Sequence, residues 1–459
     1  MIRKRVLSLA TLGLMGTPIY ALNFRLYGVL LKRGLIGPET GTFTILLYQY
    51  VTLGILYLVG IGIVFGRNSE KRTTPELLYI VLFFALIYRI LLIPFQPVLS
   101  SDVYRYIWDG RVQSQGTNPY RYSPNHEALQ ELRDAAIYPH INRKGSPTIY
   151  PAGAQAIFYL LNKLGVRDVL TFKGMTLLCD MGSIVLLFMI LGNLGLRRER
   201  VLVYAWNPLV IYELANNGHL DGFVVFFVLL TFWFMATDRP KASVASLGVA
   251  TSLKLYPLVI LPTILREKKG QGVLIFSAVI LLFYLPYLSV GRQVLGFLPE
   301  YLTNPRETFN LGLKAYLLMF FPFLSHWMVT MILTGVLTAA GVLVWKKRKK
   351  DVIDIIRFAY FLAGLQIVLA TASLHPWYLL WVIPFLSFYP SPAWLYFSLT
   401  VPFSYLKYQS PQGILPGWVT HMEYVPFLAL LAMEYFMFQR FDRHLFPRRL
   451  PGERSVYRV

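Results

Sequence analysis

A short polar helix is predicted at residues 101–111, directly after an apolar run long enough to span a membrane. Four polar side chains recur at helical spacing and are expected to share one face of it: Asp102, Arg105, Tyr106 and Asp109. A cap from Ser100 or Ser101 would place Asp102 at the positive end of the helix dipole. That position favours the ionised carboxylate that a general base or a cation-binding residue requires. A solvated interfacial helix is the structural alternative.

A single lysine, Lys254, interrupts the apolar segment 247–258. A full charge in such a segment is costly unless an anion compensates it. Tyr256 and Pro257 break the helix beside it, which favours a role as phosphate ligand near the membrane surface. Replacement of this lysine by methionine is then expected to preserve the fold. Snorkelling of the side chain to the interface is the alternative.

Two further polar side chains, His219 and Asp221, lie in the turn 216–221. Two ligands do not make a metal site, so we predict contact with a substrate or its phosphate and assign no metal. Capping of the following helix by Asp221 is the structural alternative, and the two roles are compatible.

The sequence His375-Pro-Trp-Tyr378 opens a further predicted helix. Trp377 and Tyr378 either belong to the aromatic belt of a membrane interface or stack on a sugar or a polyprenyl chain. Arg306, in the predicted loop 291–311, is another candidate ligand of an anionic substrate. The chain has neither a P-loop nor a G-x-G-x-x-G motif, so its sequence gives no support to nucleotide binding.

The composition indicates how these residues are positioned. The chain has 459 residues, of which 56% are hydrophobic and 15% are charged, whereas soluble domains carry about 25% charged residues. Apolar runs of membrane length recur, so we predict an all-α polytopic membrane protein with roughly 12–14 transmembrane helices. The net charge of +21 comes from basic residues in short loops, which is typical of cytoplasmic loops and argues against nucleic-acid binding.

The alternation of basic loops predicts that both termini are cytoplasmic and that the polar stretch 96–149 lies outside the cytoplasm. Two pairs of short apolar segments follow: 201–214 with 220–236, and 242–253 with 256–265. Irregular backbone at membrane depth survives only inside protein or beside a water-filled cavity, so we expect a cavity on the outer side. We predict one transmembrane catalytic domain, 1–459, with 96–149 as an extracytoplasmic loop subdomain that carries amphipathic juxtamembrane helices.

Several short motifs, taken in order, resemble those of the glycosyltransferase C superfamily. The closest likeness is to the bacterial polyprenyl-phosphate-mannose-dependent mannosyltransferases, which implies an integral protein of the plasma or inner membrane. The family carries a catalytic carboxylate in an early outer loop, usually after the first span, whereas three predicted spans precede Asp102. The matching motifs are Asp102-Val-Tyr-Arg-Tyr, Gly116-Thr-Asn-Pro-Tyr120, Ile149-Tyr-Pro-Ala152, Trp206-Asn-Pro208, Gly218-His-Leu-Asp221, Lys254-Leu-Tyr-Pro257 and His375-Pro-Trp-Tyr378.

The resemblance implies inverting transfer of a sugar, mannose in that family, from a polyprenyl-phosphate donor to a glycan, lipid or protein acceptor. A single displacement needs one base, for which we choose Asp102, and cations that stabilise the leaving phosphate. This chemistry calls for no cofactor, and no divalent metal is indicated. The candidate catalytic residues are Asp102, Asp109 and Asp221. The candidate substrate-binding residues are Arg105, Tyr106, His219, Lys254, Tyr256, Arg306, His375, Trp377 and Tyr378.

Two other functions remain open from the residues alone. A transporter or flippase of a lipid-linked anion would use the same basic cavity without a base, but the inverted repeats that many transporters carry are not visible. A polymerase or ligase of lipid-linked glycans would also use arginines, usually in a different loop. Release of polyprenyl phosphate in the presence of an acceptor separates the transferase from the transporter.

Overall fold

The computed structural model is helical, and the residues that it describes include seven helices long and apolar enough to cross a membrane. They are α1 (Ile2–Leu22), α3 (Thr42–Phe65), α4 (Pro75–Leu92), α7 (Val169–Asn193), the stretch 270–300 that starts in α13 (Lys269–Tyr284), α16 (His326–Lys346) and α17 (Val352–Leu369). The residues described are 2–23, 25–35, 41–66, 73–265, 269–303, 309–310, 312–347, 351–369, 373–410 and 413–441, and no strand occurs among them. The all-α polytopic class predicted from the sequence is confirmed.

Several segments that the sequence suggested as further crossings are short or broken helices. α10 (Asp221–Ala236) has 16 residues and α11 (Pro240–Leu253) has 14. The preceding chain is divided among η4 (Arg198–Val201), α8 (Leu202–Ala205), α9 (Pro208–Ile211) and the π-helical turn η5 (Tyr212–Asn216). The remaining helices are α2 (Arg25–Lys32), α12 (Leu261–Ile264), α14 (Leu298–Thr303), α15 (Leu313–Phe320), α18 (Pro392–Thr400) and α19 (Gly417–Phe441), with 3₁₀ helices η6 (Tyr256–Ile260), η7 (Leu285–Leu295), η8 (Pro376–Trp381), η9 (Ile383–Ser387) and η10 (Val401–Gln409).

The break between α8 and α9 lies inside the protein, at Asn207. Pro208 cannot continue the preceding helix, so the helix restarts, and the Asn207 side chain accepts a hydrogen bond from the Leu209 amide at 3.0 Å. The Asn207 amide donates to the hydroxyls of Tyr57 (3.2 Å) and Ser398 (3.1 Å), which belong to α3 and α18. The Asn207 side chain thus satisfies one backbone N–H of the restarted helix and ties the break to α3 and α18 inside the protein.

A buried ion pair joins α4 to α7. The guanidinium of Arg89 bonds to the carboxylate of Asp180, and both side chains are inaccessible to solvent. Arg89 also donates to the carbonyl of Ala205 at 2.7 Å, and the hydroxyl of Tyr204 donates to Asp180 at 2.8 Å. A buried pair is tolerated when such additional hydrogen bonds satisfy it, and here it fixes α8 against α4 and α7.

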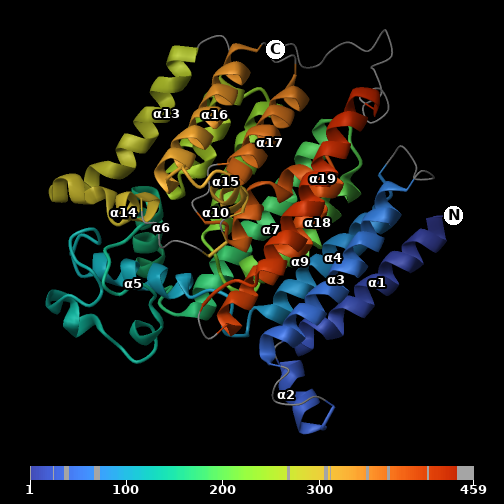
Figure 1. Ribbon diagram of the computed structural model, residues 1–459, viewed down its shortest axis with the longest axis horizontal. Coiled ribbons are helices and arrows are strands. Elements are labelled where there is room, and N and C mark those ends of the chain that lie inside the picture. Colours follow the sequence, from blue (N-terminus) through green and yellow to red (C-terminus); the bar gives the residue numbers. More distant parts are fainter. Residues whose placement is uncertain are drawn as a thin grey trace.

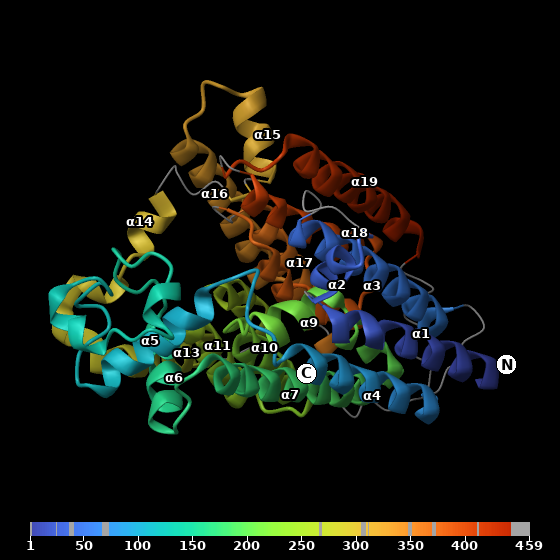
Figure 2. The ribbon, with the colours of Figure 1, turned by 90° about the horizontal axis from the view of Figure 1, so that it is seen from below.

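Figures 1 and 2 show a group of short elements at one end of the helical bundle, far from the N-terminal end of α1. The group contains α5 (Asp102–Ser114), α6 (Ala152–Lys163) and two 3₁₀ turns, η2 (Glu127–Leu132) and η3 (Tyr138–His140). α5 packs on α6, and α10 packs on both α7 and α11. The start of α5, the start of α10 and the end of α11 therefore meet at this end.

Candidate active site

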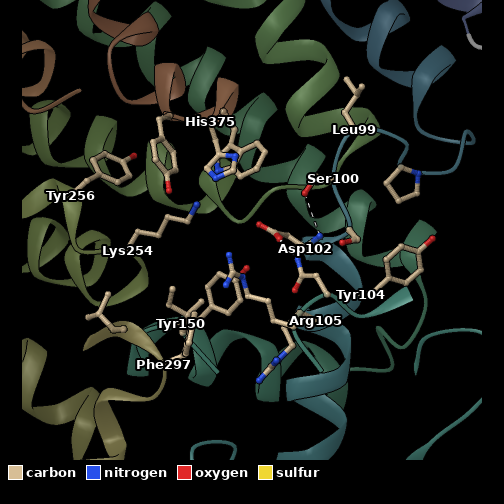
Figure 3. Close-up of a pocket in the computed structure, with 18 of the residues that line it drawn as sticks. Leu99, Ser100, Asp102, Tyr104, Arg105, Tyr150, Lys254, Tyr256, Phe297 and His375 are labelled. Atoms are coloured by element: carbon tan, nitrogen blue, oxygen red, sulfur yellow. Dashed lines mark hydrogen bonds between the residues drawn. The ribbon is translucent and has the colours of Figure 1, made fainter. Parts of the chain in front are cut away.

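A cavity of about 850 Å³ opens where these helix ends meet. Its wall combines the segment before and at the start of α5, the loop after η3, the end of α11, the start of α14 and the turn η8. This volume suits a small-molecule site, and the wall contains both aromatic and charged side chains. Figure 3 shows Asp102 and Lys254 pointing toward each other across the cavity.

Asp102 is the first residue of α5, and its carboxylate reaches the cavity. The backbone N–H of Asp102 donates to the Ser100 hydroxyl at 3.3 Å (Figure 3), so Ser100 supplies the contact at this helix start, although Ser101 is the N-cap residue. Asn142 donates from its amide to Asp102 Oδ1 at 2.8 Å. The side chain is 18% exposed. One carboxylate oxygen is thus held in place, and the group stays accessible from the cavity.

The four polar residues of α5 divide between the cavity and the interior. Asp102 and Arg105 line the cavity, whereas Tyr106 and Asp109 are buried. Asp109 accepts hydrogen bonds from Arg105 Nε at 2.8 Å and from Gln155 Nε2 at 2.9 Å. The structure therefore gives Asp109 a supporting position, in which it orients Arg105 from behind.

Tyr106 lies in an aromatic cluster behind the cavity wall. Its ring stacks on Phe158 of α6 with centroids 4.9 Å apart, and it meets Tyr150 edge-on at 5.0 Å. Tyr106 is inaccessible to solvent because α6 covers this part of α5, while Tyr150 reaches the cavity. The spacing of these residues on α5 could not show which of them reach the cavity and which lie behind its wall, because the position of α6 decides this.

Lys254 follows the last residue of α11 and forms an ion pair across to α10. Its Nζ lies 2.5 Å from Oδ2 of Asp221, and Trp381 Nε1 donates to the other oxygen of Asp221 at 3.0 Å. The Lys254 side chain is 15% exposed and lines the cavity, whereas Asp221 is fully buried. Lys254 is therefore paired inside the protein instead of snorkelling. The N-cap of α10 is Leu220, so the Asp221 carboxylate serves Lys254 and Trp381.

An aromatic wall closes the cavity beside Lys254. Tyr256 stacks on Trp381 with centroids 3.9 Å apart, and Tyr378 stacks on the same indole at 4.5 Å. Trp377 stacks on His375 at 4.3 Å. All five of these side chains line the cavity, and stacked faces of this kind can bind a sugar ring or an isoprenoid chain.

His375 is a neutral member of this wall. Burial lowers the pKa of its imidazole to about 3, and the neighbouring groups His219, Lys254 and Arg143 act in the same direction. A neutral ring contributes hydrogen bonding and stacking, so the positive charge for an anionic substrate has to come from other side chains.

Arg143 is a cavity residue that the sequence reasoning did not single out. It lines the cavity together with Asn142, and its guanidinium lies over the Phe297 ring at 5.3 Å from the centroid. Arg143 has a left-handed backbone conformation with φ of 48°, which spacing in a loop sequence does not predict. The cations on the described wall are Lys254, Arg105 and Arg143, while Arg306 lies outside the residues that the structure describes.

His219 lies behind Asp102. It is fully buried, its ring stacks on Trp377 at 4.3 Å, and its Nδ1 lies 3.9 Å from Asp102 Oδ2. The described residues that line the cavity do not include His219. Within the described ranges, no three His, Cys, Asp or Glu side chains converge in a way that could hold a metal ion.

The chain matches the model of a known protein family. The family model described as alpha-(1->6)-mannopyranosyltransferase, N-terminal domain, matches residues 11–266, which is more than half of the chain. The matched part contains Asp102, Arg105, Asp221 and Lys254, whereas the wall turn η8 lies beyond it. No curated protein and no solved structure gives a significant match. The chain belongs to the alpha-(1->6)-mannopyranosyltransferase family and is a membrane mannosyltransferase.

Proposed function

We propose that this mannosyltransferase takes mannose from a polyprenyl-phosphate donor and transfers it, with inversion, to an acceptor hydroxyl in the cavity. The observation that carries this proposal is the placement of one accessible carboxylate, Asp102, opposite a cationic and aromatic wall. A lipid-phosphate sugar presents three features that such a cavity complements: an anionic phosphate, a sugar ring and an apolar chain.

Asp102 is the proposed base. In one displacement the acceptor oxygen forms its bond to the anomeric carbon while the bond from that carbon to the phosphate oxygen breaks. The acceptor proton passes to a carboxylate oxygen of Asp102, and the electron pair of the broken bond stays on the phosphate. Asn142 holds Oδ1 of Asp102 at 2.8 Å, which leaves the second oxygen as the proton acceptor.

Lys254, Arg105 and Arg143 are the proposed ligands of the leaving phosphate. The donor phosphodiester carries one negative charge and the released monoester carries up to two, so cations already in place favour the transition state over the bound donor. Asp221 and Asp109 hold Lys254 and Arg105 from behind. The aromatic residues Tyr256, His375, Trp377 and Tyr378 would contact the sugar or the first isoprene units.

Inversion is supported by the carboxylate count of the cavity wall. Asp102 is the one carboxylate among the described residues that line the cavity. A retaining double displacement needs a second carboxylate as nucleophile, whereas a single displacement needs one base. Because the family forms α-(1→6) linkages, single inversion requires a β-linked donor.

The cavity is proposed to open on the extracytoplasmic side. The short basic segments around η4 and at the start of α11 are typical of cytoplasmic loops. In Figure 1 the elements α5, η2 and η3 lie at the opposite end of the bundle from the N-terminal end of α1. A lipid-linked donor and a glycan, lipid or protein acceptor would then meet outside the cytoplasm in the plasma or inner membrane.

The direct test uses the purified full-length protein in lipid nanodiscs with β-mannosyl polyprenyl phosphate and a synthetic α-mannoside acceptor. We expect release of polyprenyl phosphate that depends on the acceptor, and an α-(1→6) product by NMR. Asp102→Asn is the inactive control, since it keeps the size and the hydrogen bond but cannot take a proton. Movement of intact donor between leaflets without release of polyprenyl phosphate would indicate a transporter and overturn the proposal.

A further inference from the structure

A buried imidazole lies between the proposed base and a second, fully buried carboxylate. Nδ1 of His219 is 3.9 Å from Asp102 Oδ2, and Nε2 of the same ring is 3.3 Å from Glu213 Oε2. His219 and Glu213 are both inaccessible to solvent. Neither ring nitrogen makes a hydrogen bond to the described residues, although each faces a carboxylate oxygen. A buried polar side chain without a partner calls for an explanation.

The ring orientation is fixed by its surroundings. Trp377 stacks on the imidazole with centroids 4.3 Å apart and an interplanar angle of 25°. The backbone N–H of His219 donates to the Glu213 carbonyl at 3.1 Å, across the end of the π-helical turn η5. Gly218 has φ of 68°, and a Cβ there would lie 2.8 Å from Lys173 Cγ. The glycine turn and the π-helical turn thus aim both nitrogens, and π-helical turns are frequent at functional sites.

Glu213 is held as a hydrogen-bond acceptor. Tyr405 donates from its hydroxyl to Glu213 Oε1 at 2.6 Å, and Asn217 donates from its amide to Oε2 at 2.8 Å. An acceptor beside Nε2 favours the tautomer in which Nε2 carries the proton. Nδ1 then presents its lone pair toward Asp102. Two lone pairs that face each other cannot form a hydrogen bond, which accounts for the separation of 3.9 Å.

We propose that His219, oriented by Glu213, receives the proton that Asp102 takes from the acceptor. This inference rests on the proposed function, since it needs Asp102 to be the base. Once Asp102 is protonated, its O–H can donate to Nδ1, and a small approach of the two groups completes the bond. The O–H bond of Asp102 breaks, an N–H bond forms at Nδ1, and the imidazolium then lies between two carboxylates. The ionised Asp102 is restored before the product leaves.

The proton returns by the same path. Glu213 is fully buried, and the cavity is reached through Asp102, so Nδ1 gives the proton back to Asp102 and then to water after product release. His219 does not touch the substrate and is therefore a positioning residue for the base. The titratable and charged groups around its ring are Asp102 on α5, Glu213 on η5 and His375 before η8, while Lys173 on α7 packs beside the preceding residue, Gly218.

The test compares His219→Gln, Glu213→Gln and the double variant with the wild-type enzyme in the transfer assay. Gln at 219 fills a similar volume but cannot accept a proton, so we expect kcat to fall about 100-fold, in the range typical of proton-transfer groups. The donor KM should stay within about twofold. Gln at 213 offers an N–H to Nε2 and favours the other tautomer, so a similar loss is expected. The double variant should be no slower than the slower single variant, because the two residues act as one unit.

The pH dependence provides a readout that a packing role would not change. The pH profile of kcat should differ between the wild type and His219→Gln, because glutamine has no group that takes up a proton. His126→Gln, a change at the exposed N-cap of η2, is the matched control and should leave kcat and its pH profile unaltered.

Each outcome is decisive. A folded His219→Gln enzyme with normal kcat and an unchanged pH profile would overturn the inference, as would losses confined to KM. Where His219→Gln does not fold, Glu213→Gln decides by the same measurements. If the wild type releases no polyprenyl phosphate, the proposed function fails. If the wild type is active, Asp102→Asn is inactive and His219→Gln is normal, the function stands and the role of His219 is refuted.

Discussion

Replacement of Lys254 by methionine should destabilise the protein as well as inactivate it. The Asp221 carboxylate is fully buried, and it bonds to Lys254 at 2.5 Å and to Trp381 at 3.0 Å. Methionine removes the cation and leaves a buried charge with one hydrogen bond. Breaking a buried ion pair from one side costs about 3–5 kcal/mol. The sequence alone predicted that this substitution would preserve the fold, because it did not reveal the partner.

Protonation of the orphaned carboxyl would remove the buried charge, at a cost that depends on pH. For an ordinary aspartic acid, protonation at pH 7 costs about 4 kcal/mol, because three pH units contribute about 1.4 kcal/mol each. At pH 5 the same step costs about 1.5 kcal/mol. The loss of stability in Lys254→Met should therefore shrink as the pH falls from 7 to 5.

The matched variant is Lys254→Met combined with Asp221→Asn. The asparagine carries no charge and can still accept a hydrogen bond from Trp381, so most of the lost stability should return. Transfer should remain impaired, since the proposed phosphate ligand is still missing. Lys254→Arg keeps the charge and should retain part of both properties.

The measurements are the apparent Tm at pH 7 and pH 5, in the same detergent, and the donor KM and kcat of each folded variant. A Lys254→Met protein with wild-type Tm at both pH values would refute the ion-pair argument. A double variant with wild-type turnover would refute the phosphate role of Lys254 while leaving the stability argument intact.

Four further predictions concern the site and its placement. Asp102→Asn should lower turnover at least ~100-fold with the donor KM nearly unchanged; near-normal turnover would assign the base elsewhere. In a Cys179→Ala background, cysteine at Gln130 should react with an impermeant thiol reagent in intact cells and cysteine at Gln271 should not; the reverse pattern would invert the topology. Burial lowers the pKa of His375 to about 3 in the folded protein, below the usual 6.5 of the unfolded chain, so acid favours unfolding from pH 6.5 downward, by about 2 kcal/mol at pH 5. The Tm of His375→Gln should therefore fall less steeply than the Tm of the wild type as the pH is lowered over this range. Identical slopes for the two proteins would contradict a neutral ring at His375. Turnover should persist after treatment with EDTA, and a loss that Mg²⁺ or Mn²⁺ restores would introduce a metal.

Local sequence features were sufficient to predict several parts of this protein. The apolar runs predicted an all-α membrane protein because a membrane forces backbone groups to bond within helices. The polar stretch predicted α5, and its serines predicted a contact at the helix start, which Ser100 makes with the backbone of Asp102. Pro257 beside Lys254 predicted a helix end, since proline cannot continue a helix, and α11 ends at Leu253.

Tertiary structure alone decided the partners of these residues. Asp221 is 33 positions from Lys254, and Trp381 is 160 positions from Asp221, so no local spacing joins them. Asp109 and Tyr106 share the face of Asp102 but lie behind the wall because α6 covers their part of α5. Arg143 reaches the cavity through the path of a loop. Periodicity and caps act within a few residues, whereas the packing of distant helices determines which polar groups meet.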